Sequence, residues 1–153
     1  MASTINASTS PTTGIITTAD SSGNLELQNN GTTALSLQSG KVINPSVTNY
    51  TETAYTANTS TAITVSLSNG TVQILTLTGN CTLTMPTAGA GKSFIILLRQ
   101  DATGSRTITW STVNWAGGIA PTITATASKQ DIFSFFSDGT SWYGSVIGQN
   151  YTA

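Results

Sequence analysis

Residues 86–93, with the sequence PTAGAGKS, carry the chain's closest match to a phosphate-binding loop. Such a loop needs the pattern GxxxxGK[ST] followed by a helix, because backbone N–H groups and the helix N-terminus surround the phosphates. Here Pro86 stands at the first glycine position, and residues 94–98 have the apolar, β-branched character of a strand. The pattern therefore predicts a glycine-rich connection between strands and not a nucleotide site.

Carboxylates are the second group that could do chemistry. A glycosidase needs two acids on either side of the scissile bond. Asp101 and Asp131 fall near the ends of expected strands and could meet in space, but Asp131 fits the end of the Lys129-Gln130 connection better. Asp138 precedes Gly139 and is typical of a turn. We expect no catalytic residue here, and no enzymatic activity.

Histidine is absent and Cys81 is the single cysteine, so zinc sites and histidine-dependent triads lack their residues. Residues 20–26 hold acids but not the ligand spacing of a calcium loop. We therefore expect no metal and no cofactor. Cys81 lies in an alternating apolar run and is predicted to be a small buried residue.

One aromatic residue is a candidate for ligand binding. Trp115 precedes Ala116 and two glycines, which is the setting of a loop tip. An exposed indole there could stack on the face of a sugar ring, and the alternative is that it closes one end of the domain.

The composition favours a structural or binding protein over an enzyme. Only 7% of the 153 residues are charged, against about 25% in ordinary domains, while the chain has 30 threonines and 19 serines. The five basic residues are scattered and the net charge is −1, so we expect neither nucleic acid nor an anionic membrane as partner. No apolar run reaches the roughly 18 residues that span a bilayer.

The first ten residues lack the basic and apolar regions of a secretory signal, although the Thr- and Asn-rich composition suits an extracellular surface. A virus particle reconciles these two features, since its proteins are made in the host cytoplasm and freed by lysis. We therefore expect a virion component.

Residues 1–47 are predicted to form an extended arm with short strands, because they hold few large apolar residues and no aromatic. Residues 24–28 and 33–37 alternate apolar and polar around Asn29-Asn30-Gly31, which predicts a hairpin. Its thin apolar face would need other subunits. The candidate inter-subunit contacts are Ile15, Ile16, Leu25, Leu27, Leu35 and Leu37.

Residues 48–61 are predicted to be a polar connector, and residues 62–153 an antiparallel β-sandwich of jelly-roll type, so the fold should be all-β. Asn69-Gly70 predicts a two-residue hairpin, and Asp138-Gly139 a turn between the last two strands. Residues 94–98 should form a central strand that is buried on both faces or faces a neighbouring subunit. The expected strands are 63–67, 72–77, 81–85, 93–98, 107–110, 122–126, 131–136 and 141–147.

Several segments together resemble a known group. They are LTLTGNCTLTMP at 75–86, GKSFIILLRQ at 91–100, RTITW at 106–110, VNWAGG at 113–118, PTITAT at 121–126, DIFSFFSDGTSWYG at 131–144, GIITTADSSGNLELQ at 14–28 and NGTTALSL at 30–37. The chain is similar to β-modules of tail-fibre-like and other virion structural proteins of tailed bacteriophages. The resemblance implies a homotrimer and no catalytic residues.

Two functional hypotheses follow. The first is a trimeric capsid decoration (cement) protein on the capsid exterior, whose arm 1–47 binds the major capsid protein and stabilises the head. The alternative is a short tail-fibre or head-fibre protein whose sandwich binds a host-surface receptor or glycan. The short arm favours the first, since a long fibre needs a longer shaft.

Overall fold

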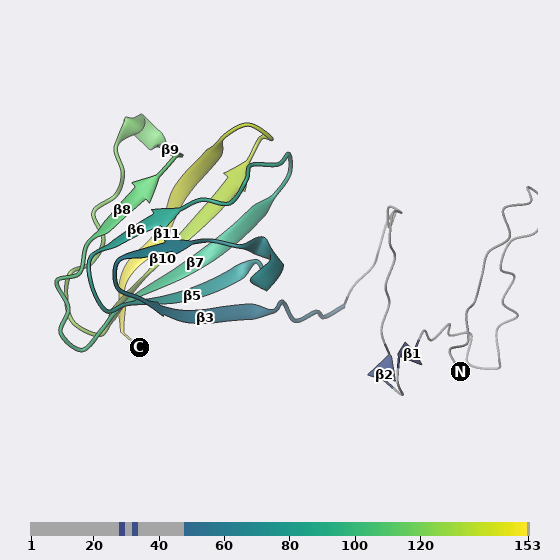
Figure 1. Cartoon of the computed structure of the whole chain (residues 1–153), viewed down its shortest axis with the longest axis horizontal. Helices are drawn as coiled ribbons and strands as arrows, with labels where there is room; N and C mark the ends of the chain where they lie inside the picture. The colour runs from purple at the N-terminus through teal and green to yellow at the C-terminus, as the bar shows by residue number, and fades with distance from the viewer. Residues whose placement is uncertain (1–27, 30–31, 34–47, 153) are drawn as a thin grey trace, which may run out of the picture. The chain divides into compact units, whose positions relative to one another are not determined.

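The computed structural model describes residues 28–29, 32–33 and 48–152 (Figure 1). The chain divides into two units, Met1–Thr48 and Asn49–Ala153. In the first unit β1 (Gln28–Asn29) and β2 (Thr32–Thr33) pair antiparallel, as the Asn-Asn-Gly turn predicts. The rest of the predicted arm lies outside the described residues. So do the candidate contacts Ile15, Ile16, Leu25, Leu27, Leu35 and Leu37.

The second unit is built from nine strands and two short 3-10 turns. The strands are β3 (Ala54–Thr59), β4 (Ala62–Thr64), β5 (Val72–Leu77), β6 (Cys81–Thr84), β7 (Ser93–Gln100), β8 (Ile108–Ser111), β9 (Val113–Trp115), β10 (Lys129–Ser137) and β11 (Trp142–Thr152). The 3-10 turns are η1 (Leu67–Asn69) and η2 (Ala116–Gly118). The all-β prediction is confirmed, and no helix in the described ranges has the length and apolarity to cross a membrane.

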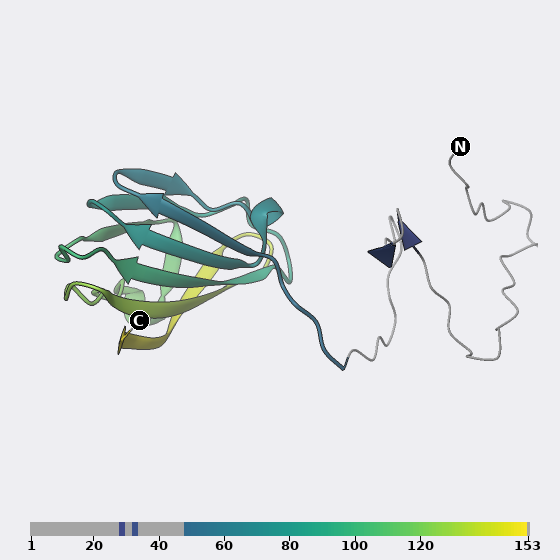
Figure 2. The ribbon, with the colours of Figure 1, turned by 90° about the horizontal axis from the view of Figure 1, so that it is seen from below.

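The strands form two layers, a six-stranded sheet in the order β3-β5-β7-β10-β11-β9 and a three-stranded sheet in the order β4-β6-β8 (Figures 1 and 2). The prediction of antiparallel pairing is correct for β7-β10-β11 and wrong elsewhere, since β3-β5, β5-β7, β4-β6, β6-β8 and β9-β11 are parallel. From β3 to β8 the chain crosses to the other sheet after every strand. Consecutive strands within one sheet therefore run in the same direction, and the second sheet serves as the crossover that parallel pairing requires.

The hairpin predicted at Asn69-Gly70 does not form, because β4 and β5 lie in different sheets. The chain makes η1 there instead, and the Gly70 N–H donates to the Leu67 carbonyl. Gly70 has a φ of +123° and packs against the Thr53 backbone so closely that a β-carbon would overlap it. The glycine is thus explained by this close approach and not by a type I′ turn.

The predicted polar connector 48–61 contains an edge strand of the large sheet, β3. Its side chains alternate, with Tyr55, Ala57 and Thr59 turned inward, and it pairs with β5 along its length. Period-two alternation among threonines and small residues was the signal for this strand.

The core lies between the two layers and is rich in aromatic rings. Phe94 of β7 stacks on Phe135 of β10 with ring centroids 4.8 Å apart. Strand β7 is central, as predicted, but only its inner residues are buried, and Ile95 on the outer face is 41% exposed. Burial on both faces is therefore wrong within one chain. The hydrophobic residues of the core are Val65, Leu75, Leu77, Cys81, Leu83, Met85, Phe94, Ile96, Leu98, Ile123, Phe133, Phe135 and Trp142.

Residues 122–126, predicted as a strand, join neither sheet. Side chains satisfy the backbone groups that a ladder would have paired. The Thr124 N–H donates to Asp131 Oδ2 at 2.6 Å, the Thr124 carbonyl accepts from Gln100 Nε2 at 2.8 Å, and the Thr122 carbonyl accepts from Gln149 Nε2 at 2.7 Å. These three bonds hold the segment beside β8 in an extended path without a partner strand.

Candidate functional site

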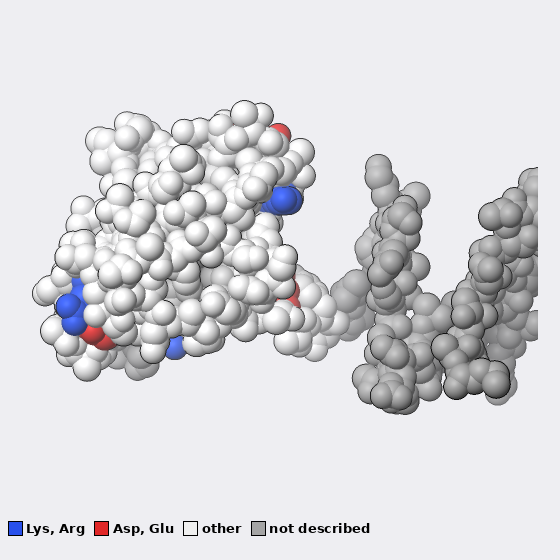
Figure 3. All heavy atoms as spheres, in the orientation of Figure 1, with Lys and Arg blue, Asp and Glu red and all other residues white. Residues whose placement is uncertain are grey.

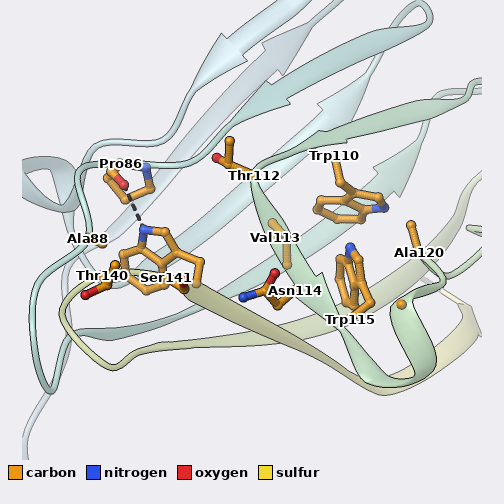
Figure 4. Close-up of a pocket in the computed structure, with 12 residues that line it drawn as sticks. Pro86, Ala88, Trp110, Thr112, Val113, Asn114, Trp115, Ala120, Thr140 and Ser141 are labelled. Carbon is orange, nitrogen blue, oxygen red and sulfur yellow. Dashed lines mark hydrogen bonds between the residues drawn. The ribbon is translucent and has the colours of Figure 1, made fainter.

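A hollow of about 690 Å³ lies where β8 and β9 meet the start of β11 (Figure 4). It gathers all three tryptophans of the chain, Trp110, Trp115 and Trp142. The remaining lining residues are Pro86, Ala88, Thr112, Val113, Asn114, Gly118, Ala120, Thr140 and Ser141. We call this the tryptophan hollow.

Trp115 reaches the hollow from β9, which pairs in parallel with β11 so that Trp115 lies opposite Gly144. Its indole packs edge-on against Trp110, with centroids 5.2 Å apart and planes at 65°, and against Phe135 at 5.8 Å. The side chain is half-buried and not exposed, because it rests on the core while it also lines the hollow. The sequence left open whether Trp115 binds a ligand or closes one end of the domain. The indole packs on the core, as in the second alternative, and lines a hollow, as the first requires.

The other two tryptophans are fixed by the core. Trp142 is 3% exposed, donates from Nε1 to the Pro86 carbonyl at 2.7 Å and packs edge-on against Phe94. Trp110 on β8 packs edge-on against Phe133 with centroids 5.0 Å apart. Rings held in this way present a preformed surface, so little conformational entropy is lost when a ligand binds.

Two of the three indole N–H groups have no acceptor, although both nitrogens are buried. The Trp115 nitrogen is directed toward the Trp110 ring, whose face carries the negative part of the aromatic quadrupole (Figure 4). The Trp110 nitrogen lies on the side of its ring toward Ala120. A buried donor without an acceptor costs free energy, and an incoming acceptor would remove that cost.

Hydroxyl and amide groups surround the aromatic floor, and a neighbouring carboxylate fixes part of them. Asp138 accepts hydrogen bonds from the backbone N–H groups of Thr140 and Ser141, both at 2.8 Å, and from the Tyr143 hydroxyl at 3.1 Å. The Ser141 and Thr140 N–H groups lower the pKa of Asp138, and the hydrogen bond with Asp138, together with its charge, raises the pKa of Tyr143. The predicted Asp138-Gly139 turn is confirmed and holds one wall of the hollow.

Thr112, which joins β8 to β9, has a φ of +57° and also lines the hollow. Its hydroxyl donates to the Ser111 carbonyl at 2.8 Å. A β-branched residue in the left-handed region is strained, so the sharp turn from β8 into β9 raises the conformational free energy of the backbone at Thr112.

A second hollow of about 560 Å³ adjoins the first, and Trp110 and Ala120 line both. Its other lining residues are Ser105, Arg106, Thr107, Ile108, Thr109, Pro121, Thr122, Ile123 and Ala125. We call it the β8 hollow. Gln100 holds its two sides together, since Nε2 donates to the carbonyls of Arg106 and Thr124 while Oε1 accepts from the Arg106 N–H.

The tryptophan hollow has no charged lining residue, and the charge in the β8 hollow is paired. Arg106 donates to Asp101 with an Nη2 to Oδ2 distance of 2.9 Å. This bond, with support from the Gly104 and Thr103 N–H groups, lowers the pKa of Asp101. Most of the surface seen in Figure 3 is likewise uncharged.

The other sequence candidates fall into structural roles. Residues 86–93 connect β6 to β7, as predicted, and the Gly91 N–H bonds to the Ser137 carbonyl. Asp101 is held by Arg106, whereas Asp131 accepts from Thr124, Gln149 and Asn150, so the two acids are bound to separate partners. Cys81 is buried with a free thiol, as predicted. Within the described ranges no three His, Cys, Asp or Glu residues gather into a group that could hold a metal ion.

A comparison with protein families adds the decisive observation. The profile of the family described as "Putative phage tail fibre C-terminal domain" matches residues 8–142. The chain belongs to this family. It is therefore a structural component of a phage virion, of tail-fibre type, made in the host cell. No curated protein and no solved structure matches the chain.

Sequence reasoning singled out Trp115 but missed Trp110 and Trp142 as parts of the same site. The parallel pairing of β9 with β11 sets Trp142 opposite Val113, and nothing local in the sequence announces that pairing. The late clustering of aromatic residues was the available signal, and it is equally typical of a core.

Proposed function

We propose that the chain is a host-contacting module of a tail fibre and that its second unit binds a host-surface receptor through the tryptophan hollow. The observation that carries this proposal is the meeting of all three tryptophans around an uncharged hollow in a member of a tail-fibre family. Its volume of about 690 Å³ lies within the usual range of ligand sites.

The composition of the hollow supports recognition over catalysis. Aromatic faces supply contact area, and Thr112, Asn114, Thr140 and Ser141 supply hydrogen-bonding groups around them. Carboxylate, thiol and imidazole groups, which would move protons or attack bonds, are absent from its lining. We accordingly propose a non-enzymatic role.

We further propose that the module acts as a homotrimer. The outer face of the six-stranded sheet carries exposed apolar residues, among them Ile95 at 41%, Phe136 at 52% and Tyr143 at 45% exposure. Phe136 and Tyr143 are paired across β10 and β11, so their side chains lie together. Symmetric burial of such a patch by other copies would remove it from water.

Capsid decoration is the second candidate, and the sequence of residues 1–47 favours it. That arm is too poor in apolar residues to build a core of its own, so it suits binding along other proteins, including the major capsid protein. Copy number separates the two functions. A decoration protein is present in hundreds of copies per particle and a fibre in tens or fewer, so quantitative gel analysis of purified virions distinguishes them.

Adsorption of the phage tests receptor binding directly. Host cells preincubated with the purified chain should adsorb less phage, because the receptor is already occupied. Thr140→Arg places a charged chain at the hollow and should abolish the inhibition, while the backbone N–H that bonds to Asp138 is kept. Asn58→Arg likewise adds an arginine at an exposed position on β3, at the opposite edge of the sheet, and should inhibit as well as the unmodified chain. Equal inhibition by both variants would contradict the assignment of the site.

A further inference from the structure

We propose that the tryptophan hollow and the β8 hollow form one groove, which binds an uncharged oligosaccharide of at least two sugar units. This inference rests on the proposed function and adds to it the chemical class and the minimum length of the ligand. It depends on three observations: the shared wall, the lack of unpaired charge, and the distribution of aromatic and hydroxyl groups.

The shared wall makes the two hollows neighbouring subsites. Trp110 and Ala120 line both, so a ligand that fills one hollow reaches the boundary of the other. Trp110 is anchored from beneath by Phe133 and Phe135, with centroid distances of 5.0 and 5.8 Å. The ring is thus a fixed divider with a separate hollow on either side. A chain of linked rings suits this arrangement better than one compact molecule.

The charges select an uncharged ligand. The tryptophan hollow is lined without any charged residue, and Arg106 in the β8 hollow already donates to Asp101 through both Nε and Nη2. An acidic sugar or a phosphate would leave water here without gaining a free cation as partner, and that desolvation is costly. The groove therefore disfavours anions.

The lining also matches the two-sided chemistry of sugar rings. A pyranose presents C–H groups on its faces, which pack on aromatic rings, and hydroxyls around its edge. The tryptophan hollow offers indoles together with Thr112, Asn114, Thr140 and Ser141. The β8 hollow offers Ile108 and Pro121 as apolar surface, and its hydroxyl groups come from Ser105, Thr107, Thr109 and Thr122.

The unpartnered indole N–H groups agree with this assignment. The Trp110 nitrogen has no acceptor and lies toward Ala120, at the boundary between the hollows. A sugar hydroxyl seated at that boundary would supply the missing acceptor. An extended peptide is the competing occupant, because β8 and β9 are edge strands of their sheets and could accept a further strand. The concentration of three indoles at one point favours the saccharide.

Binding of the full-length chain to an array of neutral and acidic bacterial glycans, followed by calorimetry with the best neutral glycan at one to four units, tests the proposal. We expect neutral glycans to bind and their acidic counterparts not to. Affinity should rise at least tenfold from one unit to three and then level off, because both hollows are then filled.

Two variants separate the subsites. Ala120→Trp fills the shared boundary and should weaken binding of every length at least tenfold. Thr122→Trp fills the β8 hollow alone, so it should lower the affinity for the trisaccharide and leave the affinity for the monosaccharide unchanged. Ala54→Trp on β3, an exposed position at the far edge of the sheet, is the matched control and should bind normally.

These experiments distinguish failure of the groove inference from failure of the proposed receptor-binding function. Equal affinity for one and three units, or an unaffected Thr122→Trp variant, would overturn the two-hollow groove. If only acidic glycans bind, or if no glycan binds while Thr140→Arg still abolishes adsorption inhibition, the ligand class is wrong and the receptor site stands. If the unmodified chain neither binds any glycan nor inhibits adsorption, both proposals are overturned.

Discussion

The indole of Trp115 lies directly over Gly144, its partner across the parallel β9-β11 pair. A β-carbon added to Gly144 would come within 2.6 Å of the ring, closer than real side chains approach. The small residue on β11 therefore creates the space in which the tryptophan lies and sets how far the ring reaches into the tryptophan hollow.

Gly144→Ala should displace the Trp115 ring and cost about 2 kcal/mol in the free energy of unfolding, as overpacking of a filled site does. Tryptophan fluorescence should shift, because the ring moves within the hollow. For the same reason the loss in the free energy of receptor binding should exceed the loss in the free energy of unfolding. Chemical denaturation and fluorescence measure the two effects. Ser145→Ala, at the exposed neighbouring position, should change neither. An unchanged emission spectrum in Gly144→Ala would contradict the contact.

A second prediction concerns Gln100, which is 5% exposed and makes three hydrogen bonds across the β8 hollow. Gln100→Leu keeps the volume but leaves the backbone groups of Arg106 and the Thr124 carbonyl without partners. We expect a loss of about 3 kcal/mol in the free energy of unfolding, since each orphaned buried group costs of the order of 1 kcal/mol or more.

Gln100→Glu is the informative companion, because it keeps the acceptor for the Arg106 N–H and loses the two bonds that the amide donates. Urea denaturation of both variants measures the free energies. Hydrogen exchange should also show faster exchange at Thr124 in Gln100→Leu, because the segment 121–125 is released. A loss below about 0.5 kcal/mol for Gln100→Leu, the usual size of surface effects, would contradict the role assigned to this side chain.

The pairing of strands shows why part of the fold could be predicted from sequence and part could not. Strand β6 has a strict period-two pattern and its burial alternates accordingly, so its existence and its inner face followed from sequence. The existence of β5 followed from its apolar residues, but its inner face did not, because Gln73 is buried there while Ile74 lies on the less buried face. The choice of partner strand did not follow from sequence either. Asn69-Gly70 is a strong hairpin signal, yet here the glycine serves a close approach to Thr53 while the chain crosses between sheets.

The segment 122–126 was predicted as a strand because its residues alternate, but it pairs with no strand. Its backbone groups bond instead to the side chains of Gln100, Asp131 and Gln149. Asp131 is only seven residues from Thr124, but Gln100 and Gln149 come from strands more than 20 residues away. The site has the same origin. Trp115 stood out beside two glycines, but Trp142 joins it only through a parallel pairing between β9 and β11, which no local pattern encodes.

A third prediction uses the pKa of Asp101, which the Arg106 hydrogen bond holds below its ordinary value of 3.8. Because the folded state binds this proton less tightly than the unfolded state, the group stabilises the fold above pH 4, and this contribution disappears as pH falls through the folded pKa. Asp101→Asn should therefore lower Tm at pH 7, and its difference from the unmodified chain should shrink as pH approaches 2. Asp138, whose pKa is also lowered, is present in both proteins and cancels in the comparison.

Thermal scans between pH 7 and pH 2 measure that difference. A gap that stays constant over the whole range would mean that the asparagine disturbs packing and not charge. Arg106→Gln provides the reciprocal test, since it removes the cation and leaves the N–H donors of Thr103 and Gly104. Its Tm should fall at pH 7 by less than that of Asp101→Asn, because part of the carboxylate's support is retained.

The fourth prediction concerns the division of the chain into its two units. Every buried hydrophobic residue of the described ranges, from Val65 to Trp142, belongs to the second unit. Residues 49–153 expressed alone should therefore unfold in one cooperative transition with the Tm of that transition in the full chain, and they should retain receptor binding, because the groove is complete within them. Differential scanning calorimetry and the adsorption assay measure these properties. A broad, non-cooperative transition would show that residues 1–48 complete the core, whereas a cooperative fold without receptor binding would place a necessary part of the site in them.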